Sequence, residues 1–401
     1  MGSLDRVVVV GASLAGLRAA ETLRRLGYEG ALTLVGAEPH LPYDRPPLSK
    51  EVLSGAWEPD RTALRKADSY AELDLDLRLG RAATGLDPGR RCIRLDDGSE
   101  LAFDRLILAT GARARRLPGQ PALAGVHTLR TLDDCLALRA ELDGSPRVVV
   151  VGAGFIGTEV AASCRARGLD VAVVERLPTP LGRVLGREAG ALVAAAHRDH
   201  GVTLHLGVGI EGFRGANRVE EVVLAGGRRL PADVVVVGVG SEPQTGFLAG
   251  SGLELRDGVV CDEHCRTRIP GVFAAGDVAR FPLPGARDLV RLEHWTHAVE
   301  QGVAAAENLL RGAGADPYRP VPFFWSDQYD LKIQLAGRPE TGDEVRVVHG
   351  SLEERRCVLL YGRAGRLAAV LGFRRPRQVM RYRRMIREGA SFDAAVAEAA
   401  G

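Results

Sequence analysis

Two glycine-rich segments have the spacing that binds the pyrophosphate of a dinucleotide. One reads GASLAG from Gly11 to Gly16, and the other reads GAGFIG from Gly152 to Gly157. The first glycine of such a turn permits a sharp change of direction, and the last lets the following helix pack against its strand. The helix N-terminus then offers backbone N–H groups to phosphate. Two such turns predict two bound dinucleotides, and such a chain is suited to passing electrons from one to the other.

Ser13 stands where the first turn would carry its second glycine, so a hydrolase nucleophile in a G-x-S-x-G turn is an alternative interpretation. Ala15 breaks that motif, and the repeat has Gly154 at the serine position. The turn also lies very early in the chain. We therefore reject the hydrolase interpretation and expect Ser13 to offer a small side chain and a possible hydrogen bond to phosphate.

Acidic residues follow the predicted strands. Glu175 ends an apolar segment, where a carboxylate accepts hydrogen bonds from the adenine ribose and repels a 2′-phosphate. NADH is therefore favoured over NADPH, although Arg176 and Arg183 could hold an extra phosphate. Glu38 is the corresponding acid of the first copy, with an ordinary surface loop as the alternative. Asp277 could accept a hydrogen bond from a ribityl hydroxyl of a flavin or could simply form a turn.

Strands alternate with helices along most of the chain, which predicts parallel sheets covered on both faces. We expect an α/β protein with two Rossmann-like dinucleotide-binding domains and a C-terminal α+β domain. The predicted boundaries are residues 1–111 with 243–320 for the first, discontinuous domain, 112–242 for the second and 321–401 for the third. Residues 92–108 predict a β-hairpin that turns at Asp97 and Gly98.

The composition of the 401 residues excludes several classes of function. A net charge of +2 gives no reason to expect binding of nucleic acid or of an anionic membrane. The first predicted strand begins at Arg6, which leaves no room for a signal peptide, and no apolar run is long enough to span a bilayer. A cytoplasmic protein is expected. Its six scattered cysteines are interpreted as reduced core residues, and Cys261 with Cys265 is not expected to bind a metal.

Several further motifs carry a resemblance to a known family. They are PYDRPPLSK at residues 42–50, ATGAR at 109–113, GFIGTE at 154–159, AAGDVA at 274–279, RLEHWTHAVEQG at 291–302 and PFFWSDQ at 322–328. In this order and spacing, the chain resembles FAD-dependent, pyridine-nucleotide-linked reductases of the glutathione reductase structural type. More narrowly, it is similar to the NADH:ferredoxin reductases of the putidaredoxin reductase and aromatic-ring dioxygenase type.

The resemblance implies roles for individual residues. Lys50 would lie near the reactive edge of the flavin and pair with Glu159, and Trp325 would pack near the isoalloxazine; these three are the expected catalytic residues. The residues expected to bind FAD are Gly11, Ser13, Gly16, Glu38, Arg45, Lys50, Arg113, Asp277, Glu293, His294 and Trp295. Those expected to bind NAD are Gly152, Gly154, Ile156, Gly157 and Glu175.

The resemblance also implies a path for the electrons. Disulfide reductases of this structural type carry a redox Cys-x4-Cys early in the flavin domain, and residues 42–50 contain no cysteine. Hydride would pass from NADH to FAD, and reduced FAD would then supply a small acidic iron–sulfur ferredoxin that serves an oxygenase.

Arginines between residues 374 and 387 could guide ferredoxin docking or could simply form a solvated helix face. The alternatives are an NADH oxidase or small-molecule reductase, and an NADH-sensing flavoprotein resembling apoptosis-inducing factor. The chain could be a monomer or a homodimer.

Overall fold

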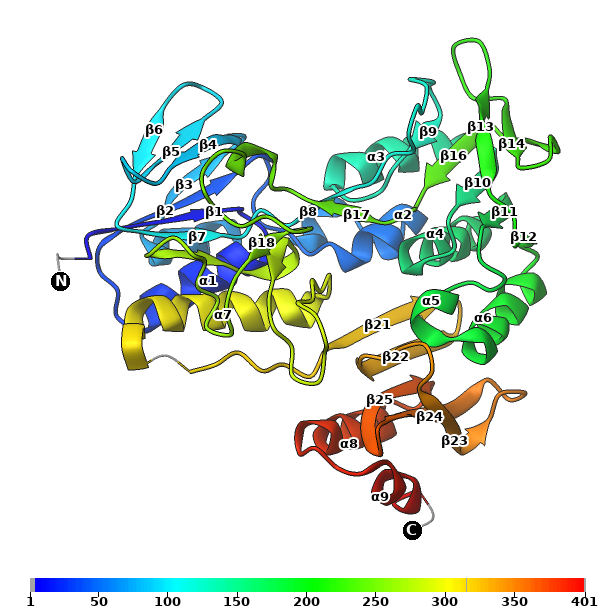
Figure 1. The fold of residues 1–401 in the computed structure, drawn as a ribbon. Helices are drawn as coiled ribbons and strands as arrows, with labels where there is room; N and C mark the ends of the chain where they lie inside the picture. The colour runs from blue at the N-terminus through cyan, green and yellow to red at the C-terminus, as the bar shows by residue number, and fades with distance from the viewer. Residues whose placement is uncertain (1–3, 315, 400–401) are drawn as a thin grey trace. The chain divides into compact units, whose positions relative to one another are not determined.

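The computed structural model describes residues 4–314 and 316–399, and the chain divides into two compact units. Unit 1 contains residues 1–44, 62–113 and 242–320, and unit 2 contains residues 45–61, 114–241 and 321–401. Each unit holds one of the two glycine turns (Figure 1). The three domain boundaries expected from the sequence remain a prediction. No helix in the described ranges is long and apolar enough to cross a membrane.

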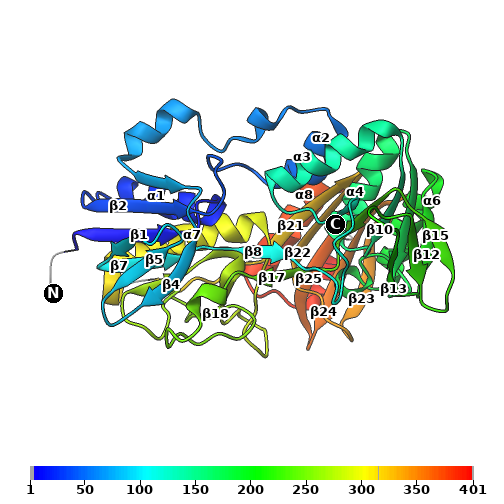
Figure 2. The same cartoon turned by 90° about the horizontal axis from the view of Figure 1, so that it is seen from above.

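Unit 1 is built on a parallel sheet in the order β19-β7-β1-β2-β3. Its central strands are apolar and buried along their length because both faces of the sheet are covered. Helices α1 and α7 lie side by side, and a Cβ at Gly302 of α7 would lie 2.4 Å from the carbonyl oxygen of Ala15 in α1 (Figures 1 and 2). The main elements are β1 (Arg6–Val10), α1 (Leu14–Arg25), β2 (Ala31–Gly36), β3 (Asp76–Leu79), β7 (Arg105–Leu108), β19 (Val272–Ala274) and α7 (Trp295–Arg311).

The predicted hairpin at residues 92–108 forms only in part. Strands β5 (Cys92–Leu95) and β6 (Glu100–Ala102) pair antiparallel around a turn in which Gly98 has a φ of 83°. The rest of the segment leaves the hairpin and becomes β7, which pairs parallel with β1. The reason is its composition: the strand reads RLIL, and a strand that is apolar at successive positions is stabilised by burial on both faces.

Other elements of unit 1 are short connections and edge strands. They include η3 (Ala67–Leu73), β4 (Ala83–Asp87), η5 (Gly246–Leu248), β18 (Val259–Val260), η6 (Gly276–Val278) and β20 (Ala279–Arg280).

Unit 2 repeats the same strand, turn, helix and strand around a parallel sheet in the order β12-β11-β10-β16-β9. The repeat extends to backbone detail. The Gly11 N–H donates to the Val35 carbonyl at 2.7 Å, and the Gly152 N–H donates to the Val174 carbonyl at 2.8 Å. The elements are β9 (Val126–His127), α3 (Leu132–Glu141), β10 (Arg147–Val151), α4 (Phe155–Ala166), β11 (Asp170–Glu175), α5 (Gly182–Leu185), α6 (Arg187–Asp199), β12 (Thr203–Leu206) and β16 (Val234–Val237).

A small antiparallel sheet and two short helical segments complete this part of unit 2. The sheet consists of β13 (Ile210–Arg214), β14 (Glu221–Leu224) and β15 (Arg229–Pro231), and the helical segments are η1 (Pro46–Ser49) and α2 (Glu51–Ser54).

The C-terminal part of unit 2 is an antiparallel sheet in the order β21-β22-β25-β24-β23. One face packs on a core shared with α5 and α6, and the other packs on α8 and α9. The elements are β21 (Phe323–Gln328), β22 (Leu331–Gly337), β23 (Glu344–Ser351), β24 (Arg356–Arg363), β25 (Arg366–Phe373), α8 (Pro376–Arg387) and α9 (Phe392–Ala397).

Candidate functional site

The first glycine turn joins β1 to α1 in unit 1. Gly11 has a φ of 118°, and a Cβ there would lie 2.1 Å from the Ala109 carbonyl oxygen, so only glycine fits. A Cβ at Gly16 would lie 1.9 Å from the Gly11 carbonyl oxygen. Ser13 is the N-cap residue of α1, but its side chain makes no capping hydrogen bond. Because the side chain of Ser13 does not cap the helix, the first N–H groups of α1 are left to donate to a ligand. Such an N-terminus favours the binding of an anion.

Two predicted carboxylates lie near the carboxyl edge of the same sheet. Asp277 belongs to the short helix η6 that follows β19, and Glu38 follows β2. Gly276, with a φ of 75°, permits the close approach to α1, because a Cβ there would lie 2.9 Å from that of Ala15. Glu38 accepts a hydrogen bond from the Tyr43 hydroxyl. The carboxyl edge of a parallel sheet is the usual place for a nucleotide, so this arrangement fits FAD.

The other residues expected at the flavin within unit 1 lie around the start of α7 and in the short strand β8 (Ala112–Ala114). The Trp295 indole N–H donates to the Asp44 carboxylate at 2.7 Å, which fixes the plane of the ring. His294 is the N-cap residue of α7, and burial lowers its pKa to about 4. Glu293 is exposed and pairs with Arg291. Arg113 is likewise exposed and pairs with Glu242 at 3.1 Å.

The second glycine turn joins β10 to α4 in unit 2. Gly152 has a φ of 101°, and a Cβ there would lie 2.3 Å from the Gly238 carbonyl oxygen. A Cβ at Gly157 would lie 2.1 Å from the Gly152 carbonyl oxygen. Gly154 differs, because a Cβ there would meet nothing within 4 Å. Ile156 beside it is 45% exposed. Open space and an exposed apolar side chain at an uncapped helix N-terminus fit a second dinucleotide.

Glu175 ends β11 with its carboxylate held at this turn. One oxygen accepts from the Ala153 N–H at 2.7 Å, and the other accepts from the Leu177 N–H at 2.7 Å. Because Ala153 lies between the first two glycines of the turn, the carboxylate is fixed beside the helix N-terminus. This position suits recognition of a ribose.

Lys50 and Glu159 come together in unit 2 as a buried ion pair. The ammonium nitrogen lies 2.9 Å from a carboxylate oxygen of Glu159, and the side chains are 14% and 4% exposed. Ser49 donates to the same oxygen at 2.5 Å, and Ser326 donates to the other oxygen at 2.7 Å. The pair is thus fully hydrogen-bonded on the carboxylate side, which is the condition under which buried charge is tolerated.

The sequence reasoning missed the polar residues that surround this pair. Ser326 and Gln328 are 0% and 1% exposed, and Gln328 donates to Thr158 at 2.9 Å and to Ser326 at 3.0 Å. The strand carries only a weak signal for them, because its sequence FFWSDQ ends in three consecutive polar residues, Ser326, Asp327 and Gln328. Such a pattern indicates either a solvated face or a buried polar network.

Trp325 lies on the other face of β21 from Ser326. Alternate side chains of a strand point to opposite faces, and Trp325 packs with Phe323 at a ring separation of 6.4 Å. The structure therefore brings together two of the three expected catalytic residues, Lys50 and Glu159, and places Trp325 in a different cluster. Arg45, at the start of η1, donates to the carbonyl of Arg130 at 2.7 Å.

All six cysteines are free and buried. Burial raises the pKa of Cys135 and of Cys164 to about 12, and it raises the pKa of Cys261 and of Cys265 further. The thiolate is the reactive form of cysteine, so these thiols are unreactive at neutral pH. The expectation that these cysteines are core residues is confirmed.

The arginines between residues 374 and 387 are partly neutralised within unit 2. Arg374 pairs with Asp330 at 3.1 Å, and Arg381 pairs with Glu398. Arg377 and Arg387 on α8 are exposed and form no ion pair with a described residue. The basic surface is therefore smaller than the sequence suggests.

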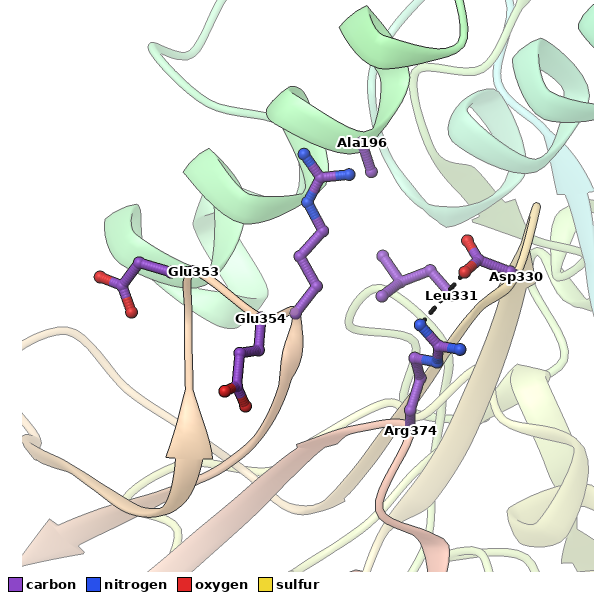
Figure 3. A pocket seen from close by; sticks show the side chains of 7 residues that line it. Ala196, Asp330, Leu331, Glu353, Glu354 and Arg374 are labelled. Atoms are coloured by element: carbon purple, nitrogen blue, oxygen red, sulfur yellow. Dashed lines mark ion pairs between the residues drawn. The ribbon is translucent and has the colours of Figure 1, made fainter.

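Figure 3 shows a cavity of about 280 Å³ in unit 2 with charged walls of both signs. Asp330 and Arg374 face each other across it as the ion pair marked in the figure. It lies beside α6 and the ends of the C-terminal strands, and none of the predicted cofactor or catalytic residues lines it. The lining residues are Ala196, Asp330, Leu331, Glu353, Glu354, Arg355 and Arg374.

Comparison with known proteins agrees with this geometry. A family model described as pyridine nucleotide-disulphide oxidoreductase matches residues 5–302, and one described as reductase C-terminal matches residues 323–400. Rhodocoxin reductase of Rhodococcus erythropolis is 39% identical over 95% of this chain and 89% of its own length. The ferredoxin reductase component of chlorobenzene dioxygenase from Cupriavidus sp. (strain PS12) is 40% identical over 97% of this chain and 94% of its own length.

A solved structure has the same fold as this chain. Putidaredoxin reductase, in its covalent complex with putidaredoxin, superposes with a TM-score of 0.92 at 33% identity, over 99% of this chain and 98% of that one. The predicted fold class, the oxidoreductase assignment and the cofactor pair of FAD and NAD are confirmed by these matches. The chain belongs to the pyridine nucleotide-disulphide oxidoreductase family, and within it to the FAD-dependent NADH:ferredoxin reductases.

Proposed function

We propose that this protein takes electrons from NADH and delivers them, through bound FAD, to a small iron–sulfur ferredoxin that supplies an oxygenase. The observation that carries the proposal is the buried ion pair between Lys50 and Glu159, of which Glu159 belongs to the helix that begins at the second glycine turn. The relatives that match nearly the whole chain are reductases of this kind by name, which supports the same activity. Bound FAD supplies what the side chains lack, which is acceptance of a hydride and release of single electrons.

The proposed task of Lys50 is to hold a fixed positive charge where negative charge develops during reduction. Such a charge is effective when it is partly desolvated and already oriented, because no reorganisation is then needed. Glu159 provides the orientation, and the hydroxyls of Ser49 and Ser326 keep Glu159 itself in place. Trp325 is proposed to exclude water near the reacting rings.

The two glycine turns are proposed to divide the nucleotides between them. In unit 2, Gly152, Gly154 and Gly157 would hold the pyrophosphate of NADH, Ile156 would cover it, and Glu175 would bind its adenine ribose. The fixed carboxylate of Glu175 would repel a 2′-phosphate, which supports NADH over NADPH. The residues proposed to bind FAD are Gly11, Ser13, Gly16, Glu38, Arg45, Lys50, Arg113, Asp277, Glu293, His294 and Trp295.

Electrons are proposed to leave without a thiol intermediate. The six thiols are buried, unbridged and of raised pKa where a shift is resolved, so none is prepared to act as a nucleophile. Six unbridged cysteines also suit a reducing compartment, and we propose that the protein works in the cytoplasm.

An acidic ferredoxin is the proposed partner, and the exposed face of α8 is part of its proposed docking surface. Arg377 and Arg387 are available there, and Met380 between them is 47% exposed. A basic surface with an apolar side chain in it combines electrostatic steering with a contact that can be desolvated.

The experiment is anaerobic reduction of a purified [2Fe–2S] ferredoxin by NADH and catalytic protein, followed in the visible spectrum. Rapid ferredoxin reduction with slow oxygen consumption is expected. Steady oxygen consumption with no reduction of several ferredoxins would select an NADH oxidase instead. Very slow turnover with all acceptors, together with an NADH-dependent change of oligomeric state, would select an NADH-sensing flavoprotein.

A further inference from the structure

A continuous series of hydrogen bonds, buried except at its Tyr329 end, runs from Tyr329 to Glu159 within unit 2. The Tyr329 hydroxyl lies 3.1 Å from Nδ1 of His197, and Nε2 of His197 lies 3.0 Å from the side-chain oxygen of Gln328. The Gln328 amide donates to Ser326 at 3.0 Å, and Ser326 donates to Glu159 at 2.7 Å. Five side chains from α4, α6, β21 and the β21–β22 turn thus form one line that ends on the partner of Lys50.

The direction of every bond in this series follows from the Glu159 end. Glu159 as a carboxylate only accepts, so Ser326 must donate to it and accept from Gln328. The amide oxygen of Gln328 then faces His197, which must carry its proton on Nε2. The other ring nitrogen of His197 therefore accepts from Tyr329. A single arrangement satisfies all the groups, and bonds aligned in this way strengthen one another.

The burial of this series argues for a role beyond packing. Ser326, Gln328, His197 and Thr158 are each 1% exposed or less, in positions where apolar residues would fold at lower cost. Burial also lowers the pKa of His197, which keeps the neutral form that the series requires. Such a network is tolerated only when it is completely satisfied, and this one is.

The backbone conformation and the ring contact of Tyr329 support this role independently. Its φ is 56°, in the left-handed region where a bulky residue is strained, and a turn between two strands would ordinarily place glycine or asparagine there. Its ring stacks on that of His200 at 3.7 Å and 8°. The backbone thus carries strain at the one residue whose hydroxyl orients His197.

We propose that Tyr329, His197, Gln328 and Ser326 are positioning residues that fix the Glu159 carboxylate, and through it the ammonium of Lys50. This inference depends on the proposed role of Lys50 in reduction by NADH. The series transmits orientation rather than protons, because a side-chain amide does not exchange a proton along the line at neutral pH. Through this series, strand β21 would fix the orientation of Glu159 on α4, and Glu159 would fix the ammonium of Lys50.

The test compares Tyr329→Phe, Ser326→Ala and their combination in the FAD-loaded protein. The control is Tyr382→Phe, which removes a buried tyrosine hydroxyl that also lies 3.1 Å from a histidine, His349, but belongs to no series that reaches Glu159. The rate constant of flavin reduction at saturating NADH, the Kd for NADH and the flavin absorption spectrum are measured. The ring nitrogens of His197 are followed by ¹⁵N NMR.

Loss of one hydrogen bond to a charged group predicts a rate about tenfold lower for Ser326→Ala. A smaller loss, about threefold, is expected for the more distant Tyr329→Phe, and Tyr382→Phe stays within about twofold of the wild type. The combined variant should be no slower than Ser326→Ala alone, because within this series only the serine reaches the Glu159 carboxylate. NMR should show the Nε2–H form of His197 in the wild type and a mixture of forms in Tyr329→Phe.

Additive effects in the combined variant, or wild-type rates in both single variants, would overturn the inference. Failure of Ser326→Ala to fold leaves the comparison of Tyr329→Phe with Tyr382→Phe, and equal rates there would overturn it as well. Lys50→Met separates the two proposals. If Lys50→Met slows reduction and the series variants do not, only the positioning inference fails; if Lys50→Met itself has no effect, the proposed function of the pair fails.

Discussion

Lys50 and Glu159 lie 109 residues apart in the sequence and 2.9 Å apart in the structure. The pair is buried, and its carboxylate has further donors in Ser49 and Ser326. A charged pair in such a place contributes little net stability by itself, but removing one member leaves the other desolvated without a counter-charge. The pair can therefore be tested through stability and activity separately.

Lys50→Met should lower the free energy of unfolding by about 3 kcal/mol, since it leaves a buried carboxylate with neutral donors only. Lys332→Met is the matched control, because Lys332 pairs with Asp327 at 3.0 Å but both side chains are well exposed. The control should cost less than about 1 kcal/mol. Urea unfolding measures the loss of stability in both variants.

The double variant Lys50→Met with Glu159→Gln should regain part of the stability but none of the rate of flavin reduction. Equal losses for the Lys50 and Lys332 variants would contradict a buried pair.

Gly154→Ala should leave the fold intact and weaken the binding of NADH. A Cβ at this position meets no protein atom within 4 Å, so the thermal midpoint is expected to stay near that of the wild type. The KM for NADH should rise about tenfold, because the methyl group enters the space proposed for the pyrophosphate. Gly209→Ala is the control, since a Cβ there is equally free of contacts and lies outside the turn. An unchanged KM in Gly154→Ala would argue against NADH at this turn.

The burial of the neutral His297 ring predicts that the protein loses stability in acid. The side chain is 1% exposed, its ring stacks on Phe281, and burial lowers its pKa to about 3. The unfolded chain protonates this histidine near pH 6.5, as an ordinary histidine does, so below that pH the unfolded state binds the extra proton. The contribution of the neutral ring to the free energy of unfolding is fully present above about pH 6.5. Below that pH the free energy of unfolding falls by about 1.4 kcal/mol per pH unit, down to about pH 3.

His297→Gln removes this titration while keeping a group that can form hydrogen bonds. The variant should be less stable than the wild type at neutral pH but should lose stability less steeply between about pH 6 and pH 4. Urea unfolding at several pH values gives both slopes. Identical slopes would show that His297 does not titrate as described.

Arg377→Gln and Arg387→Gln should weaken the use of ferredoxin without affecting NADH. Each change removes an exposed charge from α8, so kcat/KM for an acidic ferredoxin should fall about threefold at low salt, and its dependence on ionic strength should become less steep. Reduction of ferricyanide by NADH should be unchanged. Arg90→Gln serves as the control, because Arg90 is also exposed but pairs with Glu100 in unit 1. An equal effect of all three variants would remove α8 from the docking surface.

The sequence predicted the parts of the fold that local patterns determine. Gly11 and Gly152 were identifiable because a strand-to-helix turn of this kind needs a positive φ and no Cβ, and both requirements are visible in one short segment. The segment at residues 105–108 was less predictable. It continues an antiparallel hairpin in sequence, and only its apolar composition indicates a buried parallel strand.

The residues around the ion pair could not be predicted in the same way. Lys50 and Glu159 were found through a resemblance, whereas Ser326, Gln328 and His197 contact each other across separations of up to 131 residues that no local pattern encodes. For the arginines near the C-terminus the sequence suggests more than the fold retains, because it overstates the positive charge of this surface. Arg374 and Arg381 count as positive charge in the sequence, but Asp330 and Glu398 neutralise them in the fold.

The most direct test of the central claim is an anaerobic titration of the purified yellow protein with NADH, followed by mixing with excess ferredoxin. We predict that one NADH per FAD completes the reduction, that prior alkylation of accessible thiols changes nothing, and that the reduced protein then transfers its electrons singly to two ferredoxins. Uptake of a second equivalent of NADH, sensitivity to alkylation, or failure of the reduced protein to reduce any ferredoxin would contradict the account.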